Sequence, residues 1–152
     1  MVQAAEALVV DASVAAKWPL IDEPDADQAA RLLLAFTENR VALLAPRQIR
    51  HEVPSSITVA TLGAQPRLSV ADGEAAIQEF LGLDLLLTDD AYLAVSAYYL
   101  VHQLRIAYYD ALYVALSQRH TIPFVTADNK LYTRVRHLPA MLWLGNWRLA
   151  GG

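Results

Sequence analysis

Four carboxylates stand at positions that an ordinary polar surface does not explain. Asp11 and Asp128 each come just after a short apolar run, and Asp110 opens the apolar segment 110–116. The fourth acid, Glu52, lies on the edge of an apolar stripe in a segment with helical periodicity. Acidic side chains are rarely buried unless they are paired, so a fold that gathers these four needs a cation to offset them.

Strand-like and helix-like segments alternate along the chain, which predicts an α/β domain with a parallel sheet. We expect strands at residues 7–10, 41–44, 84–87 and 122–125, with a short late strand at 141–144. We expect helices at residues 25–39, 47–62, 69–81, 89–104, 109–119 and 129–135. Pro46 is expected to stop the second strand, and Pro54 to kink or restart the helix around it.

The composition limits the class of protein. A length of 152 residues fits a single domain spanning residues 1–152. The chain has no cysteine, which excludes disulfides and thiolate metal sites and suits a reducing cytoplasm. We expect no signal peptide and no membrane helix, because no apolar run approaches the ~18 residues that a span requires.

Charge and hydropathy narrow the partners. A net charge of −4 argues against binding nucleic acid through bulk charge alone, although metal ions in a nuclease supply positive charge locally. Hydrophobic residues make up 55% of the chain, so one face is expected to pack against a partner.

Each acid also has an interpretation without catalysis. Asp11 and Asp128 are equally well explained as helix N-caps, or for Asp128 as an Asx turn. A solvated helix face is the commoner setting for a glutamate such as Glu52. Asp110 favours function, because its helix is apolar on nearly every side and a buried carboxylate needs a counter-charge.

Taken together, the acids point to a divalent cation. Ligands of open parallel sheets bind beyond the carboxyl ends of the strands, where Asp11 and Asp128 are expected to lie. Two like charges ~4 Å apart repel by roughly 4 kcal/mol at an effective dielectric constant near 20. Carboxylate oxygens are the ligands that suit Mg²⁺ or Mn²⁺, and such ions activate water for attack on phosphate esters.

Four segments of the chain resemble the PIN-domain family, most closely its VapC-type toxin ribonucleases of type II toxin–antitoxin systems. They are residues 9–18, Ala45-Pro46 together with Glu52, residues 109–116 and residues 125–131. The resemblance extends from about residue 7 to residue 147. It implies a three-layer α/β/α sandwich with a mostly parallel central sheet of four to five strands.

The resemblance also implies an activity and its residues. It implies an endoribonuclease that depends on Mg²⁺ or Mn²⁺, forms a homodimer, and pairs with a small cognate antitoxin protein. By position, the metal-binding and catalytic acids are Asp11, Glu52, Asp110 and Asp128. Asp11 and Asp110 are the most direct metal ligands, with Glu52 and Asp128 completing the site. The hydroxyl groups of Ser13 and Thr126 orient carboxylates or waters behind them.

Other side chains have weaker claims. Solvated surface charge is the commoner role for five residues that could also contact RNA phosphates, namely Lys17, Arg47, Arg50, His51 and Lys130. Packing in a core or a dimer face is favoured over base stacking for Tyr98, Tyr99, Tyr108 and Tyr109. Trp143 and Trp147 could close the sheet edge or meet the antitoxin.

Two other functions compete with the ribonuclease. One is a PIN-like module that binds RNA or protein without cutting, although such a module has no need of four mutually repelling acids. The other is a phosphoryl-transfer receiver or a haloacid-dehalogenase-like phosphatase. The phosphatase requires an aspartate two positions after Asp11, where this chain has Ser13, so it fits poorly.

Overall fold

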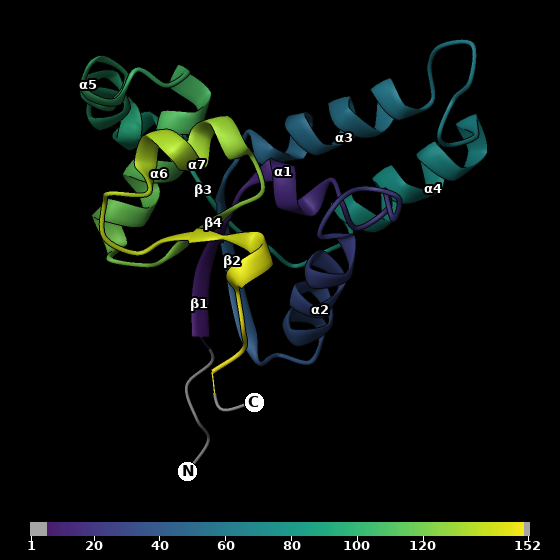
Figure 1. Cartoon of the computed structure of the whole chain (residues 1–152), viewed down its shortest axis with the longest axis horizontal. Coiled ribbons are helices and arrows are strands. Elements are labelled where there is room, and N and C mark those ends of the chain that lie inside the picture. The colour runs from purple at the N-terminus through teal and green to yellow at the C-terminus, as the bar shows by residue number, and fades with distance from the viewer. Residues whose placement is uncertain (1–5, 151–152) are drawn as a thin grey trace.

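A computed structural model describes residues 6–150, in which five strands form one parallel sheet (Figure 1). The strand order is β3-β2-β1-β4-β5, and every neighbouring pair is parallel. The strands are β1 (Glu6–Val10), β2 (Val41–Pro46), β3 (Leu86–Thr88), β4 (Phe124–Thr126) and β5 (Met141–Trp143). The expectation of a parallel sheet of four to five strands is confirmed.

Seven α-helices and two 3₁₀ turns connect and cover these strands within residues 6–150. The helices are α1 (Ala12–Ala15), α2 (Ala26–Thr37), α3 (Ile49–Ala60), α4 (Val70–Leu81), α5 (Ala94–Leu104), α6 (Tyr108–His120) and α7 (Asn129–Val135). The 3₁₀ turns are η1 (Asp90–Leu93) and η2 (Leu144–Asn146). None of the helices in this part of the chain is long and apolar enough to cross a membrane.

The direction of the strand order explains the layers. From β1 the chain moves outward to β2 and β3, then returns to the other side of β1 for β4 and β5. Because crossovers between parallel strands are right-handed, the connections before β3 and those after it cover opposite faces of the sheet. Figure 1 accordingly shows α2 on one side of the strands and α5 and α6 on the other. The three-layer α/β/α prediction is confirmed.

The core explains why α6 has no polar face. The end of β1 is fully buried at Leu8, Val9 and Val10, and α6 contacts β1, β2 and β4. Every residue of α6 from Ala111 to Ser117 is buried, because α5 covers the side of α6 that faces away from the sheet. A helix that is buried on all sides is apolar on all sides, as the sequence indicated.

Two prolines behave differently from the prediction. The helix around Pro54 does not restart, since α3 runs unbroken from Ile49 to Ala60. The carbonyl that loses its partner belongs to Arg50, an exposed residue, so water can take the place of the missing N–H. Strand β2 likewise passes the predicted end and reaches Pro46, which pairs with Thr88, because the following Arg47 N–H donates to the Thr88 carbonyl at 3.1 Å.

Two helical segments also differ from the prediction. The single helix expected at 89–104 is divided into η1 and α5, and the Asp89 carboxylate accepts the Ala91 N–H at 3.2 Å at the start of η1. The short α1 was not predicted, because four residues are too few to show helical periodicity. Its position matters for the site, since it begins directly after Asp11.

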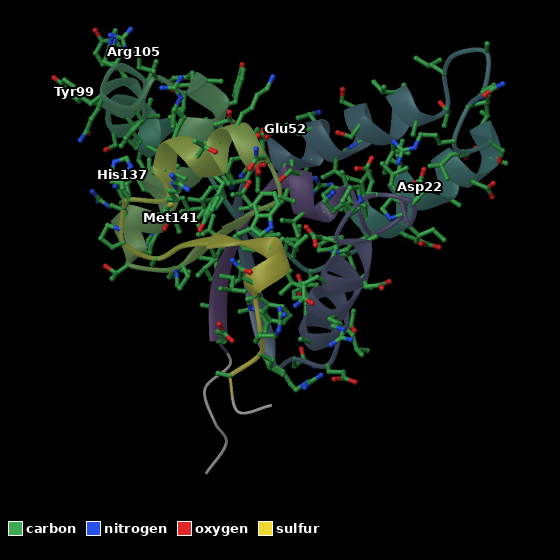
Figure 2. All side chains as sticks on the ribbon, viewed as in Figure 1. Asp22, Glu52, Tyr99, Arg105, His137 and Met141 are labelled. Carbon is green, nitrogen blue, oxygen red and sulfur yellow. The ribbon has the colours of Figure 1, made fainter. Side chains whose placement is uncertain are left out.

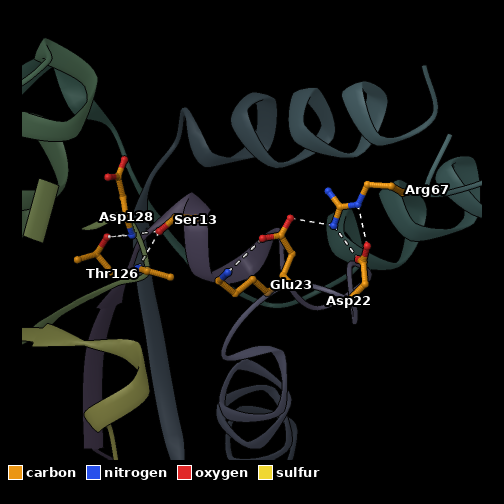
Figure 3. A network of polar contacts seen from close by, with 8 residues as sticks. Ser13, Asp22, Glu23, Arg67, Thr126 and Asp128 are labelled. Carbon is orange, nitrogen blue, oxygen red and sulfur yellow. Dashed lines mark hydrogen bonds and ion pairs between the residues drawn. The ribbon is translucent and has the colours of Figure 1, made fainter. Parts of the chain in front are cut away.

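Helices α3 and α4 form a hairpin that projects from the sheet (Figure 1). An exposed ionic cluster ties the loop between them to the chain that follows α1. Arg67 donates to both carboxylate oxygens of Asp22 at 2.9 and 2.7 Å and to Glu23 at 2.8 Å (Figure 3). The hairpin that carries Glu52 on its first helix is thus braced at its far end.

Candidate active site

All four predicted acids line one cavity of about 630 Å³. The strand order reverses between β1 and β4, so these neighbours form the topological switch point at which open α/β sheets bind ligands. Asp11 directly follows β1 and Asp128 follows β4, while Asp110 lies in the first turn of α6 and Glu52 in the first turn of α3. In Figure 2, Glu52 lies where the start of α3 approaches the body of the molecule.

Asp11 is the most deeply buried of the four, with 4% of its surface exposed. Its Oδ2 accepts hydrogen bonds from the Ser13 hydroxyl at 2.6 Å and the Thr126 hydroxyl at 2.7 Å. Burial raises the pKa of Asp11 above its ordinary value and the charge of Asp128 raises it further, while the two hydroxyl bonds act in the opposite direction. Asp11 is therefore a buried acid whose carboxylate is held in a defined orientation.

Ser13 and Thr126 join the ends of β1 and β4 into one network. The Ala127 N–H donates to Ser13 Oγ at 2.9 Å, and the Asp128 N–H donates to Thr126 Oγ1 at 3.0 Å. Figure 3 shows Ser13, Thr126 and Asp128 together at one end of the view. The two hydroxyls thus link Asp11, after the first strand, to the backbone of Ala127 and Asp128, after the fourth, which is the orienting role predicted for them.

Asp128 has the capping role that was considered for it. Its Oδ1 accepts the Leu131 N–H at 3.0 Å and so caps α7. Capping occupies one carboxylate oxygen, and Asp128 still lines the cavity beside Asp11 and Asp110. The two interpretations of this residue are compatible. Asp11, by contrast, precedes α1 without a side-chain capping bond, so the N-cap explanation fails there.

Glu52 is held by a residue that sequence reasoning did not select. The hydroxyl of Tyr113, which lies in α6 and is fully buried, donates to Glu52 Oε1 at 2.9 Å. Gln48 also joins α3 to α6, since its Nε2 donates to the Tyr109 carbonyl at 2.8 Å. A tyrosine three residues after Asp110 was visible in the sequence, but on a helix that is apolar all round it reads only as core.

The surroundings raise the proton affinity of two more acids. Burial, followed by the charges of Asp11 and Asp128, raises the pKa of Asp110 from 3.8 to about 6. Burial also raises the pKa of Glu52 from 4.5 to about 7, against the hydrogen bond from Tyr113. Neither lysine nor arginine is among the described residues that line this cavity. Among the described lining residues, His51 is the only side chain beside these acids that can carry a positive charge.

The donor set fits a hard divalent cation such as Mg²⁺ or Mn²⁺, because it consists of carboxylate and hydroxyl oxygens. Among residues 6–150, however, no three His, Asp or Glu side chains are grouped closely enough to hold a metal ion as they stand. Metal binding therefore requires carboxylates around the cavity to turn toward the ion.

The remaining candidates divide between surface and interior. Lys17 is buried and lies 3.5 Å from Glu23 Oε2, so it is neither a solvated charge nor free to contact RNA. Packing in the core is wrong for four tyrosines that are all exposed, namely Tyr98, Tyr99, Tyr108 and Tyr109, while packing in a dimer face stays a prediction. Tyr109 and His51 line the cavity of the acids, as do Ser55 and Ser56, which sequence reasoning missed. Trp143 lies on the edge strand β5, and Trp147 is buried.

The sequence profile of the PIN domain matches residues 8–138. This chain belongs to the PIN-domain family. The match covers the segments that carry Asp11, Glu52, Asp110 and Asp128, and it confirms the family resemblance seen in the sequence. A search of curated proteins found no significant match.

Solved structures of other proteins share the fold of this chain. PAE2754 of Pyrobaculum aerophilum is 18% identical with a TM-score of 0.64, over 95% of this chain and 93% of that one. VapC20 of Mycobacterium tuberculosis, a sarcin–ricin loop cleaving toxin, is 16% identical with a TM-score of 0.59, over 84% and 95%. VapBC2 of Rickettsia felis, bound to a DNA fragment of its promoter, is 12% identical with a TM-score of 0.58, over 90% and 96%.

Proposed function

We propose that the chain is a divalent-metal-dependent endoribonuclease and the toxin of a toxin–antitoxin pair, with residues 1–152 acting as one cytoplasmic domain. The observation that carries this proposal is the convergence of four carboxylates from distant segments on a single cavity without a lysine or arginine among its described lining residues. Carboxylates gathered in this way repel one another, and this repulsion destabilises the folded protein unless a cation binds between them. Membership of the PIN-domain family supports the nuclease, and the structural likeness to VapC20, a sarcin–ricin loop cleaving toxin, supports the toxin.

The proposed metal ligands are Asp11, Asp110, Asp128 and Glu52. When bound there, Mg²⁺ or Mn²⁺ would polarise a phosphoryl oxygen and lower the pKa of the attacking water. Ser13 and Thr126 restrain the Asp11 carboxylate, and Tyr113 restrains that of Glu52, so that less side-chain freedom is lost when the ligands assemble. Hydrolysis is expected to leave a 3′-hydroxyl and a 5′-phosphate.

RNA reaches this cavity from an exposed face. Tyr109 is 63% exposed beside Asp110, and its ring offers an unpaired base a surface for stacking. The expected protein partners are a second copy of the chain and a cognate antitoxin, a pairing that the two-component name VapBC2 of a structural neighbour also suggests. Exposed apolar side chains on the α3–α4 hairpin, including Val59, Leu62 and Val70, provide surface for such a partner.

The decisive experiment incubates the purified, partner-free chain with total cellular RNA. The wild type is expected to produce discrete fragments with Mg²⁺ or Mn²⁺ and none with EDTA. The Asp110→Asn variant, shown by circular dichroism to be folded, is expected to lose at least ~100-fold in rate, since metal-dependent stabilisation of a transition state is worth several kcal/mol. Sequencing of the fragment ends would identify the target.

The alternative is a PIN-like module that binds RNA or protein without cutting. Tyr109, which is exposed and lines the cavity of the acids, would serve such binding as well as it would serve cleavage. If a folded wild type cleaves no RNA with any divalent cation yet binds RNA equally well in EDTA, this alternative replaces the nuclease.

A further inference from the structure

A second cavity, of about 500 Å³, adjoins the acids on the side of α7. Asp110 and Asp128 line both cavities, so they form the wall between them. The rest of the second cavity comes from the connection between α5 and α6 and from α7. An RNA strand bound across these two acids would therefore enter a different cavity on each side of them.

The two cavities differ in charge. No lysine or arginine is among the described residues of the first, whereas Arg105, Lys130 and Arg134 all line the second. These three residues are exposed and form no ion pair within residues 6–150, in contrast to Lys17, Arg40 and Arg67. Lys130 and Arg134 are four positions apart on α7, and residues at that spacing share one face of a helix.

A cationic cavity is unexpected beside an acidic one in a chain with a net charge of −4. The overall charge gives such a protein no general attraction for a polyanion, so affinity for RNA depends on cations placed where the strand lies. Asp110 and Asp128 on the shared wall repel an anion. The part of the lining that carries Lys130 and Arg134 is where a phosphate is favoured.

We propose that this second cavity binds a phosphate group of the RNA strand next to the one that is cleaved. The proposal rests on the proposed ribonuclease function and adds the path of the substrate. The RNA strand crosses the wall formed by Asp110 and Asp128, with one flank on α7 and the other beside Tyr109 in the first cavity. Lys130 and Arg134 hold the phosphate, and Arg105 lies beside the end of α5 (Figure 2) at the border of the same cavity. None of these cations takes part in bond breaking.

The test compares three variants, K130Q, R134Q and the double variant K130Q/R134Q, with R136Q as the control. Arg136 ends the same helix and is also exposed, but it lines neither cavity, so it controls for the loss of one charge. With an oligoribonucleotide that spans the mapped cleavage site, the double variant is expected to raise KM about tenfold with kcat within twofold of the wild type, as for loss of a charge-assisted hydrogen bond. The slope of log KM against log salt should fall by about 0.7, the value for one phosphate contact on a single strand.

A neutral methylphosphonate placed at each position near the cleavage site locates the contact. The wild type should bind one such substrate more weakly than the unmodified RNA, with the modified position on one side of the cleavage site only. K130Q/R134Q should bind that substrate and the unmodified RNA with equal affinity. A KM and salt slope equal to those of R136Q would overturn the subsite. So would an equal loss from the methylphosphonate in wild type and double variant.

Binding without turnover separates this inference from the proposed function. Fluorescence anisotropy of a labelled oligoribonucleotide in EDTA should show the same tenfold loss for K130Q/R134Q and none for R136Q. A wild type that cleaves RNA, with variants that bind as tightly as R136Q, overturns the phosphate subsite alone. A wild type that cleaves nothing but shows the charge-dependent binding overturns the nuclease and retains the RNA site.

Discussion

Tyr113 donates its hydroxyl hydrogen to Glu52 Oε1 at 2.9 Å from a fully buried position on α6. Its ring stacks on Phe124 of β4 at 5.8 Å between centroids, so the donor is fixed by the core. Burial and the nearby charges of Asp11 and Glu52 raise the pKa of Tyr113, which keeps it protonated as a donor. The direction of the Glu52 carboxylate is therefore set by the sheet–helix core as well as by its own helix.

Tyr113→Phe should impair the site more than the fold. The hydrogen bond from Tyr113 lowers the pKa of Glu52, which is about 7 even with that bond, so its loss raises the pKa further. Metal-dependent cleavage at pH 7 is expected to fall by ~10-fold, with the pH–rate profile displaced to higher pH, because a charge-assisted hydrogen bond contributes ~1.5–3 kcal/mol. Tyr99→Phe, on the exposed surface, is the matched control. An unchanged pH–rate profile would show that Tyr113 serves packing alone.

The metal-free protein should lose stability as the pH rises. The pKa of Asp110 is about 6 and that of Glu52 about 7 in the folded state, both above their ordinary values of 3.8 and 4.5. At a pH between the ordinary and the folded pKa values, the folded protein therefore binds more protons than the unfolded chain. Its free energy of unfolding decreases as the pH rises through that window. With solvent screening of these half-buried groups, the loss is on the order of 2 kcal/mol from pH 5 to pH 8.

Denaturant unfolding in EDTA at several pH values measures this effect. The double variant Asp110→Asn/Glu52→Gln should have a flatter pH dependence across the same range and be more stable than the wild type at pH 8. A wild type that is more stable at pH 8 than at pH 5 would contradict the raised pKa values.

Divalent cations should reverse this loss. Mg²⁺ or Mn²⁺ is expected to bind the deprotonated carboxylates of the folded state, so at 100 times the dissociation constant it should add about 2.7 kcal/mol to the free energy of unfolding. For a domain of this size that corresponds to a rise in Tm of roughly 5–10 °C at pH 8. Scanning calorimetry with Mn²⁺ and with K⁺ at equal ionic strength separates binding from screening. A Tm that Mn²⁺ raises equally in Asp11→Asn/Asp110→Asn would place the ion elsewhere.

Expression of the wild-type chain without a partner is expected to slow growth of a bacterial host, and Asp11→Asn should relieve that effect. Asparagine is a better replacement than alanine, because its side-chain oxygen can still accept the hydrogen bond that the Thr126 hydroxyl donates to Asp11 at 2.7 Å, whereas alanine removes that acceptor. Growth curves should be read beside immunoblots showing equal soluble protein. Equal toxicity of the two forms at equal levels would indicate an effect that does not depend on cleavage.

Local sequence was sufficient for most of the elements. Strands at β1 and β4 and helices at α2, α4, α6 and α7 lie within a few residues of the predicted ranges, since apolar runs and helical periodicity reflect which face each segment buries. The errors occur where local signals compete with packing. Proline predicted a break in α3 and an earlier end to β2. In α3 the carbonyl left without a partner belongs to the exposed Arg50 and can bind water, and β2 stays paired through the Arg47 N–H after Pro46.

The sequence by itself determined that acids follow the first and fourth strands and open the most apolar helix, because hydrophobic patterning places strand ends and helix starts. Only the tertiary structure decided that Asp11, Glu52, Asp110 and Asp128 share a cavity, that Tyr113 reaches Glu52, and that Lys130 and Arg134 face a second cavity behind the same wall. These relationships join residues tens of positions apart. Strand order and crossover direction set them, and no local pattern of residues contains that information.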